Sequence, residues 1–485
     1  MKWGAIMYFM NQYFKIVLFT LVFYIIPFPL FAFTYEIHGD MKQAIGFTSN
    51  ADVFSLKLNS AETDYFQYKT HLNQVVQNDF TPLNFMNSPK SNDVTFGATR
   101  GILWIKGKTD DNKASLVYGA EVQGYNWGDN EQDFGLAGEG LTQETYLLYA
   151  DVKAPWAQSA DNFFRIGLQH VDISDWVWNE TAAGLTFHGK NGMSQWMLGW
   201  FRGENDKYTN ASDNNYFVAH FQRPLEGDNH LEFFCIYEHT GEEATPEFLK
   251  DPNDLTIRHY RLYSSDTYYL GVNSQFTFGS MFGTIDIIYQ GGNINFIQNK
   301  YFDDIPGLER SANLIHLTGG IQVTDKFKLY GTILSISGDM NESDLDVDNF
   351  KSIDVKGKVG QIFFKDSIIG DIDHHGADAP YFQDKGLIQF ALTGEYQYRP
   401  NHHFKFALRH LMTQVDLPVR GPEETKDNDI GTEIDFWYHY SLNQYATLVF
   451  ESAYLYPRNG GDMMTDYPCD AKKLFQMISG VEISF

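Results

Sequence analysis

A strict alternation of apolar and polar residues toward the C-terminus restricts the fold of this chain more than any other feature. In the segment LIQFALTGEYQYR, residues 387–399, Phe390 and Leu392 fall on one face, whereas Thr393 and Glu395 fall on the other. A period of two residues belongs to a β-strand with one apolar and one polar face. The pattern recurs further along the chain, in residues 402–412, 433–442 and 475–485. The sequence therefore predicts amphipathic strands that follow one another.

Strands of this kind are predicted from residue 34 to the end of the chain. We expect about eighteen of them, with about sixteen as the alternative, each of roughly ten residues, the length that a tilted strand needs to cross a bilayer. The predicted strands begin near residues 34, 98, 114, 142, 162, 183, 194, 214, 229, 259, 281, 312, 326, 386, 402, 430, 446 and 471.

The connections between these strands alternate between short and long. The short ones include residues 110–113, 189–192, 279–280 and 400–401, and the long ones include 50–97, 127–141, 241–258 and 339–385. This alternation is typical of transmembrane barrels, in which short periplasmic turns alternate with long extracellular loops. A soluble sandwich of two sheets is the alternative for amphipathic strands, but it gives no reason for such an asymmetry.

Aromatic residues gather near strand ends on the apolar faces, as Tyr396, Tyr398, Tyr454 and Tyr456 do. This is the position of the aromatic girdle in a membrane barrel. Because a bilayer has no water to satisfy an open sheet edge, a spanning sheet must close on itself. We therefore predict an all-β fold, a transmembrane antiparallel up-and-down β-barrel.

The first and last strands are predicted to pair and close this barrel. Tyr35 and Ile37 alternate with polar residues in the first strand, and the chain ends on the alternating Ile483 and Phe485. A final residue that belongs to a strand pattern is unusual in a soluble domain, whose last residues tend to fray. We expect these four residues to lie at the closure of the barrel.

An apolar run near the N-terminus, residues 16–33, follows Lys15 and has two prolines near its end. A short apolar run between a positive charge and a small residue, here Ala32, is typical of a secretory signal peptide. We predict that residues 1–32 are a cleavable signal peptide and that residues 33–485 form a single barrel domain. An uncleaved spanning helix is the alternative.

The composition argues against several classes of function. A formal net charge of −26 disfavours a nucleic-acid partner. The two cysteines, Cys235 and Cys469, lack a CxxC or CxxCH spacing, which disfavours structural zinc and haem. The sequence has no GxSxG, Walker, Rossmann or EF-hand motif, so neither an enzyme nor a bound cofactor is expected.

Several segments carry a resemblance to a known family: YEIHGDMKQAIGF at 35–47, TRGILWIKGKTDDNKASLVYGAEV at 99–122, FFRIGLQHVDISD at 163–175 and the terminal Phe485. Together with the signal peptide they resemble bacterial outer-membrane porins, and the chain is most similar to the homotrimeric porins of sulfate-reducing bacteria. The resemblance implies a homotrimer in the outer membrane of a Gram-negative bacterium, in contact with outer-membrane lipid and lipopolysaccharide. It also implies that the barrel-insertion machinery recognises the terminal aromatic residue.

The resemblance further implies where the pore is narrowed. In such porins a loop after the fifth strand folds inward, and its acidic residues face a ladder of basic residues. The matching segment here is DISDWVWNET at 172–181, which carries Asp172, Asp175 and Glu180. Opposed charges of this kind set a field across a narrow pore that favours small polar solutes.

Alternation places five basic residues on the polar face as candidates for this ladder: Arg100, Arg165, Arg399, Lys405 and Arg409. Glu433 and Asp435 are predicted to line the pore as well. Each of these groups is either a charge at the constriction or a wall charge neutralised by its neighbours. The long loops at 50–97 and 339–385 are alternative segments for narrowing the pore, unless they cap the outer surface.

One acidic segment, GDIDHHGADAP at 370–380, contains residue types that bind metals. Its candidate ligands are Asp371, Asp373, His374, His375 and Asp378. Carboxylates spaced in this way suit calcium, and adjacent histidines suit a transition metal. The alternative is a solvated loop tip that shares divalent cations with lipopolysaccharide.

The sequence thus predicts a water-filled channel for the passive diffusion of small hydrophilic solutes and ions. Two alternatives stay open. One is a substrate-specific channel for a sugar, an organic acid or an inorganic ion. The other is a barrel that sheathes or supports a complex between the periplasm and the cell surface.

Overall fold

The computed structural model describes residues 33–49, 94–128, 142–157, 161–203, 214–247, 259–296, 307–340, 346–355, 359–362, 366–368, 385–419, 425–464 and 473–485. The predicted signal peptide at 1–32, the segment 50–93 and the candidate metal ligands Asp371, Asp373, His374, His375 and Asp378 lie outside these ranges. Across the described ranges, no helix combines the length and the apolar character needed to span a membrane.

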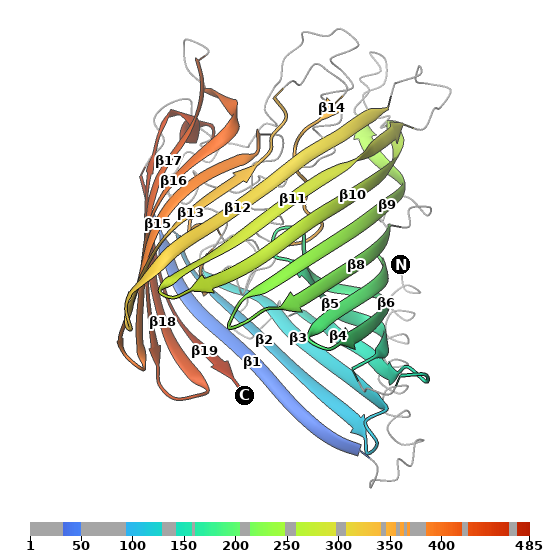
Figure 1. The fold of residues 1–485 in the computed structure, drawn as a ribbon. Coiled ribbons are helices and arrows are strands. Elements are labelled where there is room, and N and C mark those ends of the chain that lie inside the picture. The colour runs from blue at the N-terminus through green and yellow to red at the C-terminus, as the bar shows by residue number, and fades with distance from the viewer. Residues whose placement is uncertain are drawn as a thin grey trace, which may run out of the picture.

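Most described residues belong to the strands of one sheet (Figure 1). The strands are β1 (Phe33–Thr48), β2 (Val94–Thr109), β3 (Ala114–Gly128), β4 (Thr142–Lys153), β5 (Phe163–Ser174), β6 (Trp178–Asn191), β7 (Ser194–Arg202), β8 (Asn215–Pro224), β9 (His230–Glu247), β10 (His259–Phe278), β11 (Met281–Phe296), β12 (Leu308–Thr324), β13 (Phe327–Ile336), β14 (Asp346–Val347), β15 (Leu387–Arg399), β16 (His402–Val419), β17 (Thr425–Ser441), β18 (Ala446–Pro457) and β19 (Leu474–Ser484). A short 3-10 helix, η4 (Asn459–Met464), follows β18.

The sheet closes into a barrel because consecutive wall strands pair antiparallel and β1 pairs with β19. Of the nineteen strands, eighteen form the wall, and β14 lies apart from it as a two-residue strand that pairs in parallel with β12. The prediction of a closed antiparallel barrel of about eighteen strands is confirmed.

Alternation located the strands closely. The first residues of the predicted and observed wall strands differ by five at most, as at 183 against Trp178 and at 430 against Thr425. Most of the wall strands are longer than the predicted ten residues, and their lengths run from nine residues in β7 to twenty in β10. Part of the extra length lies at the loop ends, since β9 continues to Glu247, within the stretch 241–258 that was predicted as a loop.

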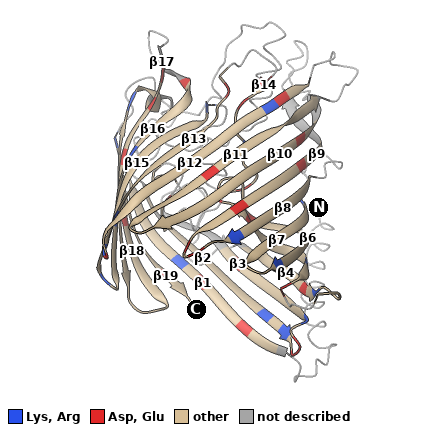
Figure 2. Ribbon diagram, in the orientation of Figure 1, with Lys and Arg blue, Asp and Glu red and all other residues tan. Residues whose placement is uncertain are grey.

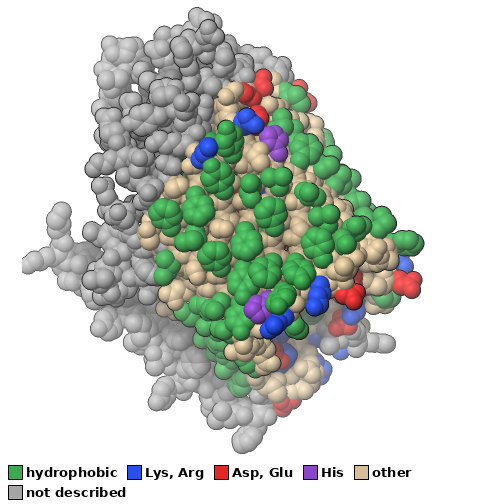
Figure 3. Space-filling model, turned by 90° about the vertical axis from the view of Figure 1, so that its left-hand side faces the viewer, with side chains coloured by type: hydrophobic (Ala, Val, Ile, Leu, Met, Phe, Trp, Pro, Cys, Tyr) green, Lys and Arg blue, Asp and Glu red, His purple; other side chains and the backbone are tan. Residues whose placement is uncertain are grey.

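The outer wall of the barrel is apolar, and the inner face carries the polar groups. Leu317, Ile333 and Phe390 lie side by side on three neighbouring strands and are 36, 44 and 48% exposed. The alternate residues Gln389 and Thr393 point inward and are buried. Hydrophobic side chains cover much of the outer face in Figure 3, with charged side chains near its margins, and charged residues are sparse along the strands in Figure 2. This sidedness is the reverse of that of a soluble protein and is typical of a transmembrane barrel.

The short turns at one end use residues that tolerate a left-handed backbone. Asn112, Gly192 and Gly279 have φ values of 52°, 61° and 60°. In the first of these turns, hydrogen bonds from Lys113 and Thr109 lower the pKa of the exposed Asp111 carboxyl group to about 2. A lowered pKa means that these contacts persist at neutral pH and are lost only as the pH falls through that value.

The closing register joins the two ends of the chain. Met41 lies opposite Ile483, and Gly39 and Phe485 exchange two main-chain hydrogen bonds of 2.9 Å. The Phe485 ring covers Gly39, since a Cβ atom at this glycine would lie 2.5 Å from the ring. The final residue is therefore part of the closed sheet.

Tyr35 and Ile37 lie beside this closure and not within it. They pair with Gly107 and Ile105 of β2, and no residue of β19 lies opposite them. The reason is that β1 begins beyond the point where β19 ends. The closing pairs involving Ile483 and Phe485 thus lie further along β1 than the sequence predicted.

We expect deletion of Phe485 to lower the free energy of unfolding by about 1–3 kcal/mol, because two main-chain hydrogen bonds, each worth about 0.5–1.5 kcal/mol, are lost. Urea unfolding in detergent micelles measures this change. Phe485→Ala keeps the main-chain bonds and is the control. Equal losses in the two variants would show that the ring, and not the backbone, secures the closure.

Candidate functional site

Part of the chain between β13 and β15 lies inside the barrel. We call its described residues, 337–340, 346–355, 359–362 and 366–368, the crossing segment. Its described side chains Val347, Phe350, Val359 and Ile368 are almost fully buried. Within this segment, the two residues of β14 pair with β12. The described part of the loop that the sequence placed at 339–385 therefore enters the lumen and does not cap the outer surface.

The crossing segment is bonded to the wall and to the turn between β5 and β6. The Lys351 N–H donates to the Gln290 side chain of β11 at 2.8 Å. The Ile353 N–H donates to the Val177 carbonyl at 2.8 Å, and the Ser352 hydroxyl donates to the Trp176 carbonyl at 2.8 Å. These contacts join two segments that are far apart in the sequence.

The turn between β5 and β6 also folds inward. The Trp176 ring packs against the His316 ring of β12 with a centroid distance of 4.9 Å, and Val177 is fully buried. This turn belongs to the segment that resembles the inward loop of porins. The turn is only three residues long and reaches a short way into the lumen. It contacts the crossing segment there, and the two together narrow the lumen.

The other end of the crossing segment reaches β16–β19 and β1–β2. The Trp437 indole N–H donates to the Asp366 carbonyl at 3.0 Å. Ile368 packs with four further buried residues from β1, β2, β18 and β19: Ala44, Ala98, Val449 and Ile478. The described parts of the segment thus pass from the β5–β6 and β11–β12 side of the lumen to the closure of the barrel.

An apolar core surrounds the crossing segment, although the sequence predicted a polar inner face throughout. Phe234, Leu334 and Leu411 point inward and pack in one buried cluster with Phe350 and Ile362. At this level the apolar side chains of the wall pack directly against those of the segment. Strand stretches that are apolar on both faces, such as FFCIY at 233–237, were the available signal.

The structure brings four of the predicted pore residues together, namely Lys405, Arg409, Glu433 and Asp435. The Arg409 guanidinium donates to Asp435 at 2.7 Å and to Asp366 of the crossing segment at 3.5 Å. The Lys405 ammonium donates to the same Asp366 oxygen at 3.2 Å and lies 4.0 Å from the centre of the Trp437 ring. Two basic residues of the proposed ladder are therefore neutralised by nearby carboxylates.

The remaining basic candidates lie apart from this group. Arg165 donates to Asp151 at 2.7 Å, and Arg100 is ion-paired with the buried Glu121. Arg399 is exposed at the turn end, where it lies 5.2 Å from the centre of the Tyr398 ring. The five basic residues thus do not form one continuous ladder.

The acidic candidates also lie in two separate places, near the β5–β6 turn and on β17. Asp172 and Asp175 are exposed, and Asp175 accepts a hydrogen bond from Asn179 at 2.8 Å. Glu180 is half-buried and accepts a hydrogen bond from the Thr181 N–H at 2.9 Å. Glu433 is fully buried beside the crossing segment.

Two residues at this constriction escaped the sequence reasoning: Asp366 and Trp437. With others they line a cavity of about 150 Å³ between the crossing segment and β16–β19. Trp437 gave a signal, because it is an aromatic residue on the polar face of a strand whose other aromatic residues point outward. Asp366 gave none, since its partners are distant in the sequence.

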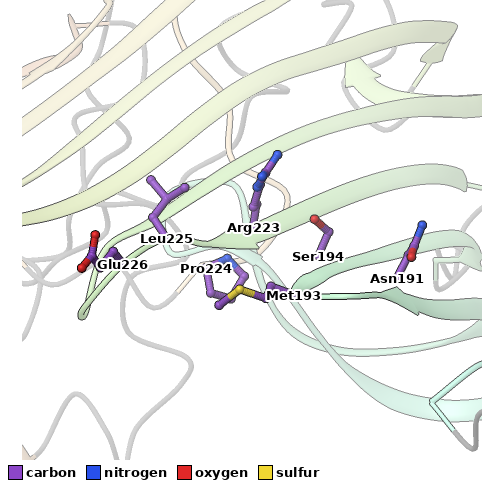
Figure 4. Close-up of a pocket in the computed structure, with 7 residues that line it drawn as sticks. All are labelled: Asn191, Met193, Ser194, Arg223, Pro224, Leu225 and Glu226. Carbon is purple, nitrogen blue, oxygen red and sulfur yellow. The ribbon is translucent and has the colours of Figure 1, made fainter.

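A wider hollow of about 570 Å³ lies at the turn end of the barrel, between the β6–β7 and β8–β9 turns (Figure 4). Its lining residues are Asn191, Met193, Ser194, Arg223, Pro224, Leu225 and Glu226. None of the predicted pore residues lies there. Among the described residues, no group of three histidine, cysteine or acidic side chains is arranged to hold a metal ion.

Comparison with known proteins identifies the fold. No protein-family model matches the sequence, and no curated protein matches it. The outer membrane protein OpdK of Pseudomonas aeruginosa is 9% identical, with a TM-score of 0.50 over 93% of this chain and 98% of its own. OccK8 (OprE) of the same organism is 8% identical, with a TM-score of 0.49 over 93% of this chain and 98% of its own.

The anion-selective porin of Comamonas acidovorans is 8% identical, with a TM-score of 0.42 over 93% of this chain and 100% of its own. At such low identity the matches bear on the fold alone. The similarity to OpdK shows that the chain has the barrel architecture of a bacterial outer-membrane protein.

Proposed function

We propose that this protein is an outer-membrane porin through which small hydrophilic solutes and ions diffuse. The observation that carries the proposal is the sidedness of the closed barrel. Ile333 and Phe390 face outward and are exposed, whereas Asp286, Glu238 and Gln290 face inward and are buried. A wall of eighteen strands is wide enough to enclose an aqueous channel.

The proposal places the barrel in the outer membrane of a Gram-negative bacterium, surrounded by lipid and lipopolysaccharide and inserted by the barrel-insertion machinery. The proposal also includes assembly into a homotrimer. This part rests on the resemblance of the sequence to the homotrimeric porins of sulfate-reducing bacteria. Chemical cross-linking of the protein in native outer membranes would test this assembly. A product no larger than one chain would contradict it.

A substrate-specific channel is the second candidate, and the crossing segment favours it. A general pore needs no polypeptide across its lumen, whereas a selective pore needs a constriction lined by placed polar groups. The cavity beside Lys405, Trp437 and Glu451 is such a place.

A barrel that sheathes a partner is less well supported, because the crossing segment occupies part of the lumen. The proposal assigns the protein no catalysis, and hydrolysis of lipid or peptide by the purified protein would contradict it.

The purified protein should give stepwise conductance in a planar bilayer, and its reversal potential in a salt gradient measures ion selectivity. We expect Arg165→Ala to raise the cation-to-anion permeability ratio by about two-fold, because Asp151 loses its neutralising partner. Arg399→Ala is the matched control, since this arginine is exposed at the turn end. Absence of any conductance would refute the channel. Conductance with an unchanged ratio in Arg165→Ala would refute only the placement of this pair beside the ion path.

A further inference from the structure

We infer that two buried carboxylates of the wall, Glu433 of β17 and Glu451 of β18, are positioning residues that hold the crossing segment by its backbone and thereby set the bore of the channel. The inference rests on the proposed function and adds a role that alternation did not suggest for either residue. Alternation placed Glu433 among the charges that line the pore. Its carboxylate instead accepts a hydrogen bond from the main chain of the segment and lies beside Arg409 and Asp435 of the wall.

Each carboxylate accepts one main-chain hydrogen bond from the segment. The Ile362 N–H donates to Glu433 Oε1 at 2.8 Å, and the Ile368 N–H donates to Glu451 Oε2 at 3.0 Å. The backbone approaches Glu433 closely at Gly360, where a Cβ atom would lie 2.8 Å from the carboxylate. The fit thus requires both the acceptor on the wall and a glycine on the segment.

Neighbouring groups of the wall complete this attachment. The Gln361 side chain donates to the Phe436 carbonyl at 2.9 Å, and the Trp437 indole N–H donates to the Asp366 carbonyl at 3.0 Å. Asp366 also receives the Lys405 and Arg409 contacts. The described residues of the segment from Gln361 to Ile368 are therefore held along β16–β18 by hydrogen bonds and ion pairs.

The burial of Glu433 and Glu451 distinguishes a carboxylate that positions the segment from one that attracts ions in the pore. Glu433 is 0% exposed and Glu451 is 3% exposed, so bulk water reaches neither carboxylate freely. Arg409 and Asp435 lie directly beside Glu433 on the wall, and His439 lies 3.9 Å from Glu451. A buried N–H that loses its acceptor is costly to leave unpaired. Removal of the two carboxylates should therefore release the segment.

The double variant Glu433→Ala/Glu451→Ala should raise single-channel conductance by about two-fold or more, because a loosened segment leaves a wider path. The double variant Glu433→Gln/Glu451→Gln removes the same charges but keeps an oxygen that accepts each N–H. It should conduct like the wild type. If the Gln variant matched the Ala variant in conductance, the two residues would act through charge and the positioning role would be refuted.

Glu238→Ala supplies the matched control for the loss of a buried lumen carboxylate. Glu238 is 3% exposed on β9 and accepts a hydrogen bond from the Tyr269 hydroxyl of the wall at 3.3 Å. This variant should leave the conductance unchanged. The shift in mobility between heated and unheated samples on SDS gels shows in every case whether the barrel has folded.

A second readout does not depend on conductance. Ser367 is 4% exposed in the segment, and Ser367→Cys can be labelled with a water-soluble maleimide in a background where Cys235 and Cys469 are serine. Labelling should be about ten-fold faster in the Ala double variant than in the Gln double variant, because the segment opens locally. Equal rates would overturn the inference even in a protein that conducts. A non-conducting wild type with the expected labelling difference would instead refute the channel alone.

Discussion

Replacing residues 339–384 by a loop of about four residues should raise the single-channel conductance severalfold, because this removes the crossing segment from the lumen of an eighteen-stranded barrel. The replacement is compatible with the wall, since Gly338 lies directly against the main chain of Lys385. A short hairpin loop can therefore join β13 to β15. Conductance steps in planar bilayers measure the effect.

The wall of this deletion variant should stay intact, because the pairing of β13 with β15 does not involve the removed residues. Heat-modifiable mobility on SDS gels and the far-ultraviolet circular dichroism spectrum should match those of the wild type. A folded variant with unchanged conductance would show that the crossing segment does not limit the flow.

Ile333→Arg should destabilise the barrel in lipid by about 2–4 kcal/mol, the range measured for a basic residue on the lipid face near the bilayer midplane. Ile333 of β13 lies between Leu317 of β12 and Phe390 of β15, and all three face outward. The guanidinium group of the arginine would be transferred from water into the hydrocarbon of the bilayer. No described acidic residue lies opposite it on the neighbouring strands. Urea unfolding in lipid vesicles measures the loss.

Thr332→Arg is the control for this substitution, because the neighbouring residue of the same strand faces the lumen. Its hydroxyl lies 3.2 Å from that of Thr318, so the variant loses one polar contact and places its charge on the inner side. We expect a cost of less than about 1.5 kcal/mol. If both variants lost the same stability, the outer face of β13 would not contact lipid.

The wall of the barrel could be predicted because a strand residue has only two environments. Once Phe390 and Leu392 were assigned to the outside, Gln389 and Thr393 had to face inward, and the exposures agree. Long and short connections then fixed the order of the strands. Strand length was predicted less well, because apolar residues also occupy parts of the inner face and interrupt the alternation, as in FFCIY at 233–237.

The constriction could be predicted only in part, since it depends on contacts between distant segments. Alternation put Lys405, Arg409 and Asp435 on the inner face, where the structure has them close together. It gave no information on Asp366, which reaches them from a loop without any periodicity. Main-chain bonds such as that between Ile353 and Val177 leave no trace in the sequence at all.

The seam between β1 and β19 has a consequence for biogenesis. The Phe475 N–H donates to the Ser49 hydroxyl at 2.9 Å across a sequence separation of 426 residues, and Gly39 bonds to the final residue. Contacts between residues so far apart in the sequence form slowly, because a long stretch of chain must first be brought together. Until these contacts form, the sheet has two unpaired edges, and such edges are sites of aggregation in water.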